Sequence, residues 1–73
     1  MMAKYIRFDD CGKEWAGQPI VDIRNQRTGD DLGELTWYAP WGQWIARFRD
    51  GAVWSADCLR DVAAELTRRN EGG

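Results

Sequence analysis

The chain has no histidine, only two cysteines and two prolines, and no long hydrophobic run. Without histidine, the Ser/His and Cys/His nucleophile pairs and histidine-dependent general acid–base catalysis are excluded. No glycine-rich turn leads into a Lys-Ser or Lys-Thr helix start, so there is no phosphate-binding loop. The adjacent carboxylates at Asp9-Asp10 and Asp30-Asp31 fall at expected turns, where solvation explains them. The sequence therefore predicts a protein that is not an enzyme.

The two cysteines, Cys11 and Cys58, are far apart in the sequence. A zinc site needs a cluster of Cys or His ligands, so we expect no metal and no cofactor. Two cysteines do not form the disulfide framework of a small secreted protein, although a single disulfide between them stays open. Because no apolar run is long enough for a signal peptide or a membrane span, we expect a cytoplasmic protein with no membrane contact.

Excess charge of either sign is also lacking. Lys and Arg total 10 and Asp and Glu total 12, which gives a formal net charge of −2. Nucleic-acid binding usually requires a clustered basic surface, so this balance disfavours it. Aromatic residues, in contrast, are abundant, with five Trp, two Tyr and two Phe. A chain this short buries a modest core, and aromatic rings are one way to compensate.

Alternating apolar and polar residues predict an antiparallel sheet. Gly29 and the pair Asp50-Gly51 supply the positive φ of tight hairpin turns, and Pro40 with Gly42 allows a further reversal. Val21 and Ile23 are expected to face the core, and Asp22 between them to face solvent. The expected strands cover residues 4–8, 20–27, 32–38 and 43–49, with a loop at 9–19.

Two positions in this pattern leave alternatives open. Trp15 in the loop either folds back over the core or stays exposed as a contact residue. After Asp50-Gly51, a short fifth strand is expected at 52–54. If the turn has two residues, Arg47 lies beside Trp54 for a cation–π contact, whereas a three-residue bulged turn would point Trp54 inward.

The last element is an amphipathic helix at 56–69, with Ser55 as its N-cap. Its predicted apolar stripe would cover one sheet face, and its expected solvent face includes Glu65. The predicted fold is therefore α+β, an antiparallel β-meander of four to five strands with one C-terminal α-helix packed on one face. It would form a single domain, 1–73, with flexible ends at 1–3 and 70–73. The expected stripe is Leu59, Val62, Ala63 and Leu66, and the expected covered residues are Val21, Ile23, Leu35, Trp37, Trp44, Ala46 and Phe48.

The uncovered sheet face and the turn at 39–42 hold more aromatic and arginine residues than a surface without a binding role needs. Trp, Tyr and Arg are the residues enriched in protein-binding hot spots, so we expect a protein-binding surface. A nucleic-acid platform on the same face and a homodimer through the sheet edge or the aromatic face are alternative hypotheses. The candidate partner-binding residues are Trp41, Tyr38, Arg47, Arg49, Trp54 and Trp15.

The segment 23–66 resembles a pattern found in small proteins encoded by bacteriophages and prophages. The pattern is carried by Thr28-Gly29, Leu32-Gly33, Trp37-Tyr38, Trp41, Trp44, Phe48 and Cys58-Leu59, and residues 1–22 lie outside it. It contains no catalytic residue to carry over. The resemblance implies a non-catalytic protein of the bacterial cytoplasm that binds and blocks a host protein or complex, such as an anti-CRISPR inhibitor of a CRISPR effector.

Overall fold

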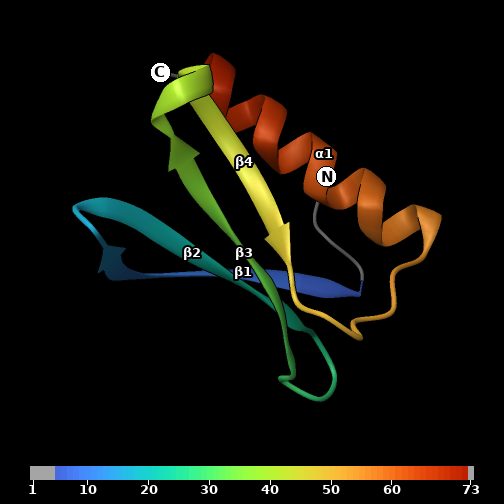
Figure 1. Ribbon diagram of the computed structural model, residues 1–73. Helices are drawn as coiled ribbons and strands as arrows, with labels where there is room; N and C mark the ends of the chain where they lie inside the picture. The colour runs from blue at the N-terminus through green and yellow to red at the C-terminus, as the bar shows by residue number, and fades with distance from the viewer. Residues whose placement is uncertain (1–4, 73) are drawn as a thin grey trace.

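The computed structural model describes residues 5–72, except for the side chain of Cys11. Four strands form one sheet in the order β1-β2-β3-β4, and each neighbouring pair is antiparallel. A short 3-10 helix, η1, connects β3 to β4, and the helix α1 follows the sheet (Figure 1). The predicted α+β meander with one C-terminal helix is thus confirmed. The elements are β1 (Ile6–Trp15), β2 (Gln18–Asn25), β3 (Asp31–Tyr38), η1 (Ala39–Trp41), β4 (Gln43–Phe48) and α1 (Ala56–Glu71).

The first hairpin is much longer than the sequence indicated. The expected loop at 9–19 is instead the second half of β1, a tight turn and the start of β2. The pairing of β1 with β2 shifts between Asp9 and Lys13, and Gly12 within this shift has a φ of +78°. A glycine that looked like a strand breaker therefore forms a β-bulge, which interrupts the apolar alternation without ending the strand.

The expected fifth strand does not form. Residues 52–55 run as an irregular connection to α1, after a turn in which the Ala52 N–H donates to the Arg49 carbonyl at 3.2 Å. Trp54 lies inward against Phe48, with ring centroids 4.2 Å apart. Of the two alternatives for Trp54, the inward position holds and the contact with Arg47 does not form, so Trp54 packs at the edge of the core.

The core lies between the sheet and α1, on what we call the inner face of the sheet. Partly buried Phe8, Trp44, Ala46, Trp54, Cys58 and Leu66 surround it, and Cys58 is a free thiol. Trp37 and Phe48, expected under the helix, remain exposed. The helix packs mainly along β4. The fully buried apolar residues are Ile6, Val21, Ile23, Leu35 and Val62.

The helix is rotated from the predicted stripe, since Leu59 and Ala63 are exposed while Glu65 and Arg69 turn toward the sheet. Ser55 caps its start as predicted, with its hydroxyl accepting from the Cys58 N–H at 3.2 Å. The helix continues past the predicted end to Glu71. The predicted flexible end at 1–3 lies outside the described residues.

Asn70 in the last turn of α1 ties the helix to the outer edge of β4. The Trp44 N–H donates to Asn70 Oδ1 at 2.7 Å, and Asn70 Nδ2 donates to the Trp44 carbonyl at 3.5 Å. This side chain therefore occupies both backbone groups of Trp44, as a fifth strand would. The chain at 70 is fixed to the sheet rather than frayed.

Candidate protein-binding face

The sheet surface opposite α1, which we call the outer face, collects the side chains that alternate with the core residues. The register aligns them in rows across the strands: Asp9, Asp22, Glu34 and Arg47 in one row, and Ile20, Thr36 and Ile45 in the next. The remaining members are Arg7, Lys13, Trp15, Arg24 and Tyr38. One end of this face is aromatic and the other end is charged.

At the aromatic end, η1 presents Trp41 on a fixed backbone. Pro40 starts the 3-10 turn, and Gly42 ends it with a φ of +61°, donating its N–H to the Tyr38 carbonyl at 2.9 Å. The Trp41 ring meets the Tyr38 ring edge-on, with centroids 5.2 Å apart and planes at 89°. Trp41 is nevertheless 68% exposed. Trp41 and Tyr38, both predicted as candidate residues, therefore contact each other at the surface.

Trp15 lies at the same end of the sheet but on the other hairpin. It opposes Gln18 next to the β1–β2 turn, and it is 70% exposed. The expected lid over the core is therefore wrong, and the exposed alternative holds. Figure 1 shows the β1–β2 and β3–β4 hairpins diverging at this end. Trp15 thus borders the outer face without joining the pair of Trp41 and Tyr38.

The charged end is an ion-pair network centred on Asp22. Although its side chain lies on the outer face, Asp22 is buried, because Lys13 and Arg24 cover it. Lys13 Nζ donates to Asp22 Oδ2 at 2.7 Å, and Arg24 donates to the same oxygen at 3.3 Å. The hydrogen bond from Lys13, supported by Arg24, lowers the pKa of Asp22 although burial acts against it. The expectation that Asp22 faces solvent is wrong for this reason.

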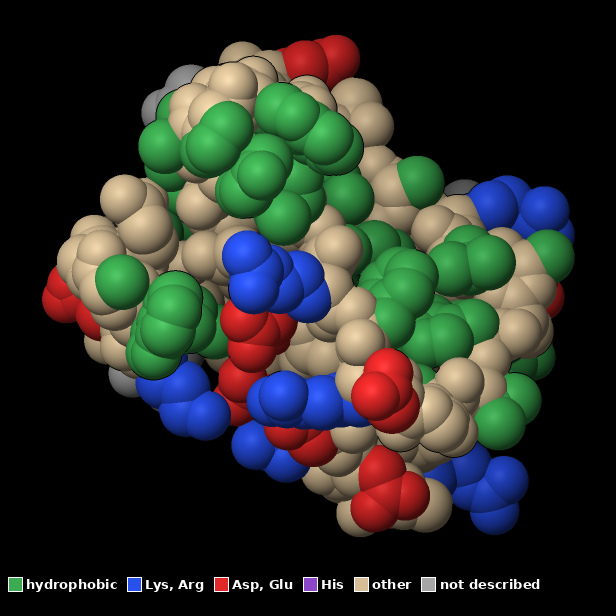
Figure 2. All heavy atoms as spheres, viewed as in Figure 1, with side chains coloured by type: hydrophobic (Ala, Val, Ile, Leu, Met, Phe, Trp, Pro, Cys, Tyr) green, Lys and Arg blue, Asp and Glu red, His purple; other side chains and the backbone are tan. Residues whose placement is uncertain are grey.

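Arg49 and Arg47 lie toward the charged end of the outer face. Arg49 binds Asp31 at 2.9 Å and approaches Glu34 at 3.9 Å. The hydrogen bond to Asp31 raises the pKa of Arg49. Arg47 is exposed and opposes Glu34 in the register of β3 with β4. Figure 2 shows this mixture, with basic and acidic side chains side by side between groups of hydrophobic ones.

The structure therefore places five of the six candidate residues on or beside the outer face and removes one. Trp54 packs inward against Phe48, on the other side of the sheet. The list of candidate residues left out Ile20 and Ile45, which fill the outer face between its aromatic and charged ends. Their alternation with core residues was the signal that could have identified them. Val53, in the connection that replaces the expected strand, is 87% exposed.

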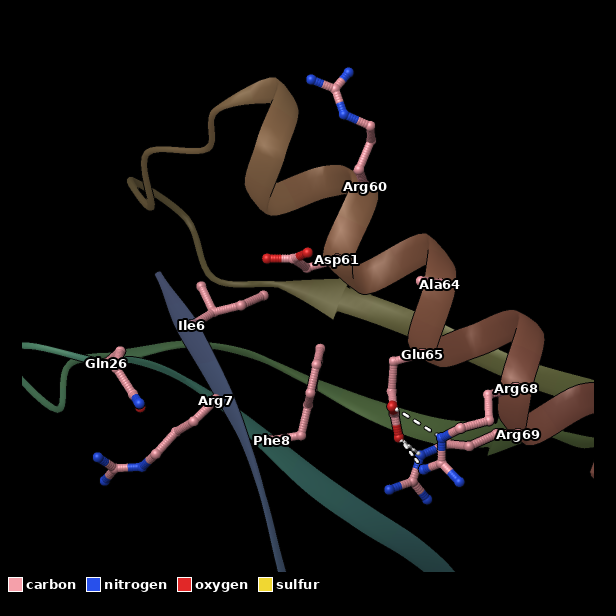
Figure 3. Close-up of a pocket in the computed structure, with 10 residues that line it drawn as sticks. All are labelled: Ile6, Arg7, Phe8, Gln26, Arg60, Asp61, Ala64, Glu65, Arg68 and Arg69. Atoms are coloured by element: carbon pink, nitrogen blue, oxygen red, sulfur yellow. Dashed lines mark hydrogen bonds and ion pairs between the residues drawn. The ribbon is translucent and has the colours of Figure 1, made fainter. Parts of the chain in front are cut away.

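A groove of about 680 Å³ separates β1 from α1 on the inner side (Figure 3). Ile6 and Phe8 line it from β1, and Glu65, Arg68 and Arg69 line it from α1. Glu65 accepts hydrogen bonds from Arg68 and Arg69, and these bonds lower its pKa, Arg68 contributing most. The Arg69 guanidinium also lies 5.0 Å from the Trp44 ring centroid.

No helix within residues 5–72 is long and apolar enough to cross a membrane. The same part of the chain holds no group of three or more Cys, Asp or Glu side chains placed to bind a metal ion. Comparisons with protein-family models, with curated proteins and with solved structures found no match for this chain.

Proposed function

We propose that this protein is a non-catalytic binding protein that occludes a site on a partner protein, with Trp41 as its anchor. The observation that carries the proposal is a large aromatic side chain that is 68% exposed on a backbone fixed by Pro40 and Gly42. A tryptophan presented in this way loses little conformational freedom on binding and can bury a large area. Tyr38 beside it and Arg47 farther along the face are the other residue types typical of hot spots.

The charge pattern favours a protein over a nucleic acid as the partner. Three cations of the outer face pair with carboxylates of the same face: Lys13 and Arg24 with Asp22, and Arg49 with Asp31. A surface of matched charges provides little of the counterion release that drives nucleic-acid binding. The resemblance to phage-encoded proteins favours a bacterial host complex as the partner, and a CRISPR effector is the first one to test.

The test begins with capture of host proteins on the immobilised chain, followed by titration of the captured complex in purified form. Trp41→Ala should raise Kd by about 30-fold or more, the equivalent of a hot spot of about 2 kcal/mol. Val53→Ala is the matched control, because it also shortens an exposed apolar side chain but lies in the connection between β4 and α1, outside the sheet and η1. Where the partner is a CRISPR effector, the wild-type chain and the control should inhibit target cleavage and Trp41→Ala should not.

Stability measurements separate an anchor from a structural residue. Trp41→Ala removes one edge-on ring contact, which is worth about 0.5–1.5 kcal/mol. Its Tm should therefore fall by no more than about 10 °C for a domain of this size. A larger fall would mean that Trp41 supports the fold, and unchanged affinity would mean that the partner binds elsewhere.

A further inference from the structure

The two edges of the sheet differ in what binds their backbone N–H and carbonyl groups. The β4 edge is occupied at Trp44 by the Asn70 side chain, which binds both its N–H and its carbonyl. Among residues 5–72, β1 pairs with no strand other than β2, and α1 lies across the groove on the inner side. A long strand with an open edge is a template for pairing with another strand. The edge at Ile6–Asp10 is therefore open to pairing with a further strand.

The direction of the backbone groups on this edge follows from the hydrogen bonds to β2. Gln26 N–H donates to the Tyr5 carbonyl at 2.8 Å, so Tyr5 and, by alternation, Arg7 direct their backbone groups toward β2. Ile6 and Phe8 then direct their N–H and carbonyl groups outward, and Asp10 continues the alternation. Asp10 keeps its side chain on the inner face, 3.8 Å from Arg69, as this alternation requires.

We propose that β1 pairs with β1 of a second copy, antiparallel and in register about Phe8. In this register Phe8 exchanges both backbone hydrogen bonds with Phe8 of the other copy, and Ile6 does so with Asp10. Arg7 and Asp9, neighbours on the outer face, then lie opposite Asp9 and Arg7 of the other copy. Cross-strand pairs without backbone hydrogen bonds have the closest side chains, so both charge pairs meet at short range.

The self-complementary order Arg-Phe-Asp is the reason for choosing a second copy rather than an unrelated strand. A shift of two residues in either direction would place Arg7 opposite Arg7, or Asp9 opposite Asp9, and like charges directly opposite destabilise a sheet. The two-fold axis would leave both α1 helices on the inner side and apart, since each packs mainly along β4. The two grooves of Figure 3 would then join across the half-buried Phe8 side chains.

Sedimentation over a concentration series is the first measurement. The contact is small, so a Kd on the order of micromolar or weaker is expected. Arg7→Glu should raise Kd by about tenfold or more, because two attractive pairs become repulsive. Asp9→Arg should do the same, and the double variant Arg7→Glu/Asp9→Arg, which exchanges the charges, should restore dimerisation. Arg27→Glu is the matched control, since Arg27 is an exposed arginine in the β2–β3 turn.

Hydrogen exchange supplies a second readout that does not depend on charge. The amides of Ile6 and Phe8 should be protected at high protein concentration and exchange rapidly on dilution, and Arg7→Glu should remove the protection. A chain that stays monomeric at millimolar concentration, or a dimer that the charge exchange does not rescue, would overturn the proposal. Trp41→Ala should leave the dimer intact, so failure here is separate from failure of the partner-binding proposal.

Discussion

Replacing Gly33 by alanine tests the register of the sheet most directly. Gly33 lies in the middle of β3, opposite Phe48 of β4 and Ile23 of β2, and it is buried. A Cβ at this position would lie 2.3 Å from the Arg47 carbonyl oxygen and 3.1 Å from the Phe48 Cα. Both are backbone atoms, so no side chain can rotate away. Strand β4 would have to move, together with the helix packed on it.

The expected cost can be worked from this geometry. Overpacking of about 1–3 kcal/mol adds to about 1–3 kcal/mol for an alanine at a φ of +157°. The sum, about 2–6 kcal/mol, compares with a total stability of about 4–11 kcal/mol for a domain of this length. We therefore expect Gly33→Ala to lose a large share of its stability, or to be unfolded at room temperature.

Urea denaturation, followed by circular dichroism and tryptophan fluorescence, measures this loss. At a slope of about 1 kcal/mol per M, the midpoint should fall by about 2 M or more. Gly51→Ala is the matched control: its φ is +81°, but a Cβ there would meet nothing within 4 Å. That variant should lose only about 1–2 kcal/mol. If Gly33→Ala were as stable as Gly51→Ala, the close approach of β3 to β4 and the pairing built on it would be wrong.

Three further predictions follow from the ion pairs and the edge cap. Asp22→Asn should lower the free energy of unfolding by about 1–3 kcal/mol at pH 7. Because folding lowers the pKa of Asp22, its ionised carboxylate stabilises the wild-type protein above about pH 4, and this contribution is lost as the pH falls. The urea midpoints of the wild-type protein and of Asp22→Asn should therefore converge toward pH 2. Folding also lowers the pKa of Glu65, so Glu65→Gln should likewise destabilise the chain at neutral pH and less so in acid. Asn70→Ala should speed hydrogen exchange at the Trp44 amide, whereas Asn70→Asp, which keeps the acceptor, should not; equal rates in both variants would refute the edge cap.

The fold class could be predicted because the turns and the helix cap have strong local signals. Gly29, Gly42, Gly51 and Ser55 each supply a backbone or capping property that few other residues provide. The second half of β1 could not be predicted in this way. Its glycine and its run of polar residues are typical of a loop, and only pairing with β2 makes them a bulged strand.

The candidate site was predicted in part for a similar reason. Tyr38 immediately precedes η1 and Trp41 is its last residue, and the local turn signals predict both positions. The position of Trp54 depended on the path of the chain after β4. Trp54 packs against Phe48, and residues 52–54 do not continue as a fifth strand. The burial of Asp22 depended on Lys13, which becomes its neighbour only after the β1–β2 register is fixed. Tertiary contacts of this kind leave no periodic trace in the sequence.

The two proposals, taken together, make a joint prediction about affinity. Pairing through β1 would produce one continuous eight-stranded sheet whose two outer faces lie on the same side. Each Trp41 follows β3, away from the paired edge, so the dimer would display two separated anchors to one partner surface. A partner complex with repeated subunits would then be bound with avidity, and Arg7→Glu should weaken that binding although it lies far from the anchor. Binding to a single isolated subunit should be unaffected by Arg7→Glu and still lost with Trp41→Ala. Equal effects of Arg7→Glu on both partners would show that the β1 edge contacts the partner directly rather than a second copy.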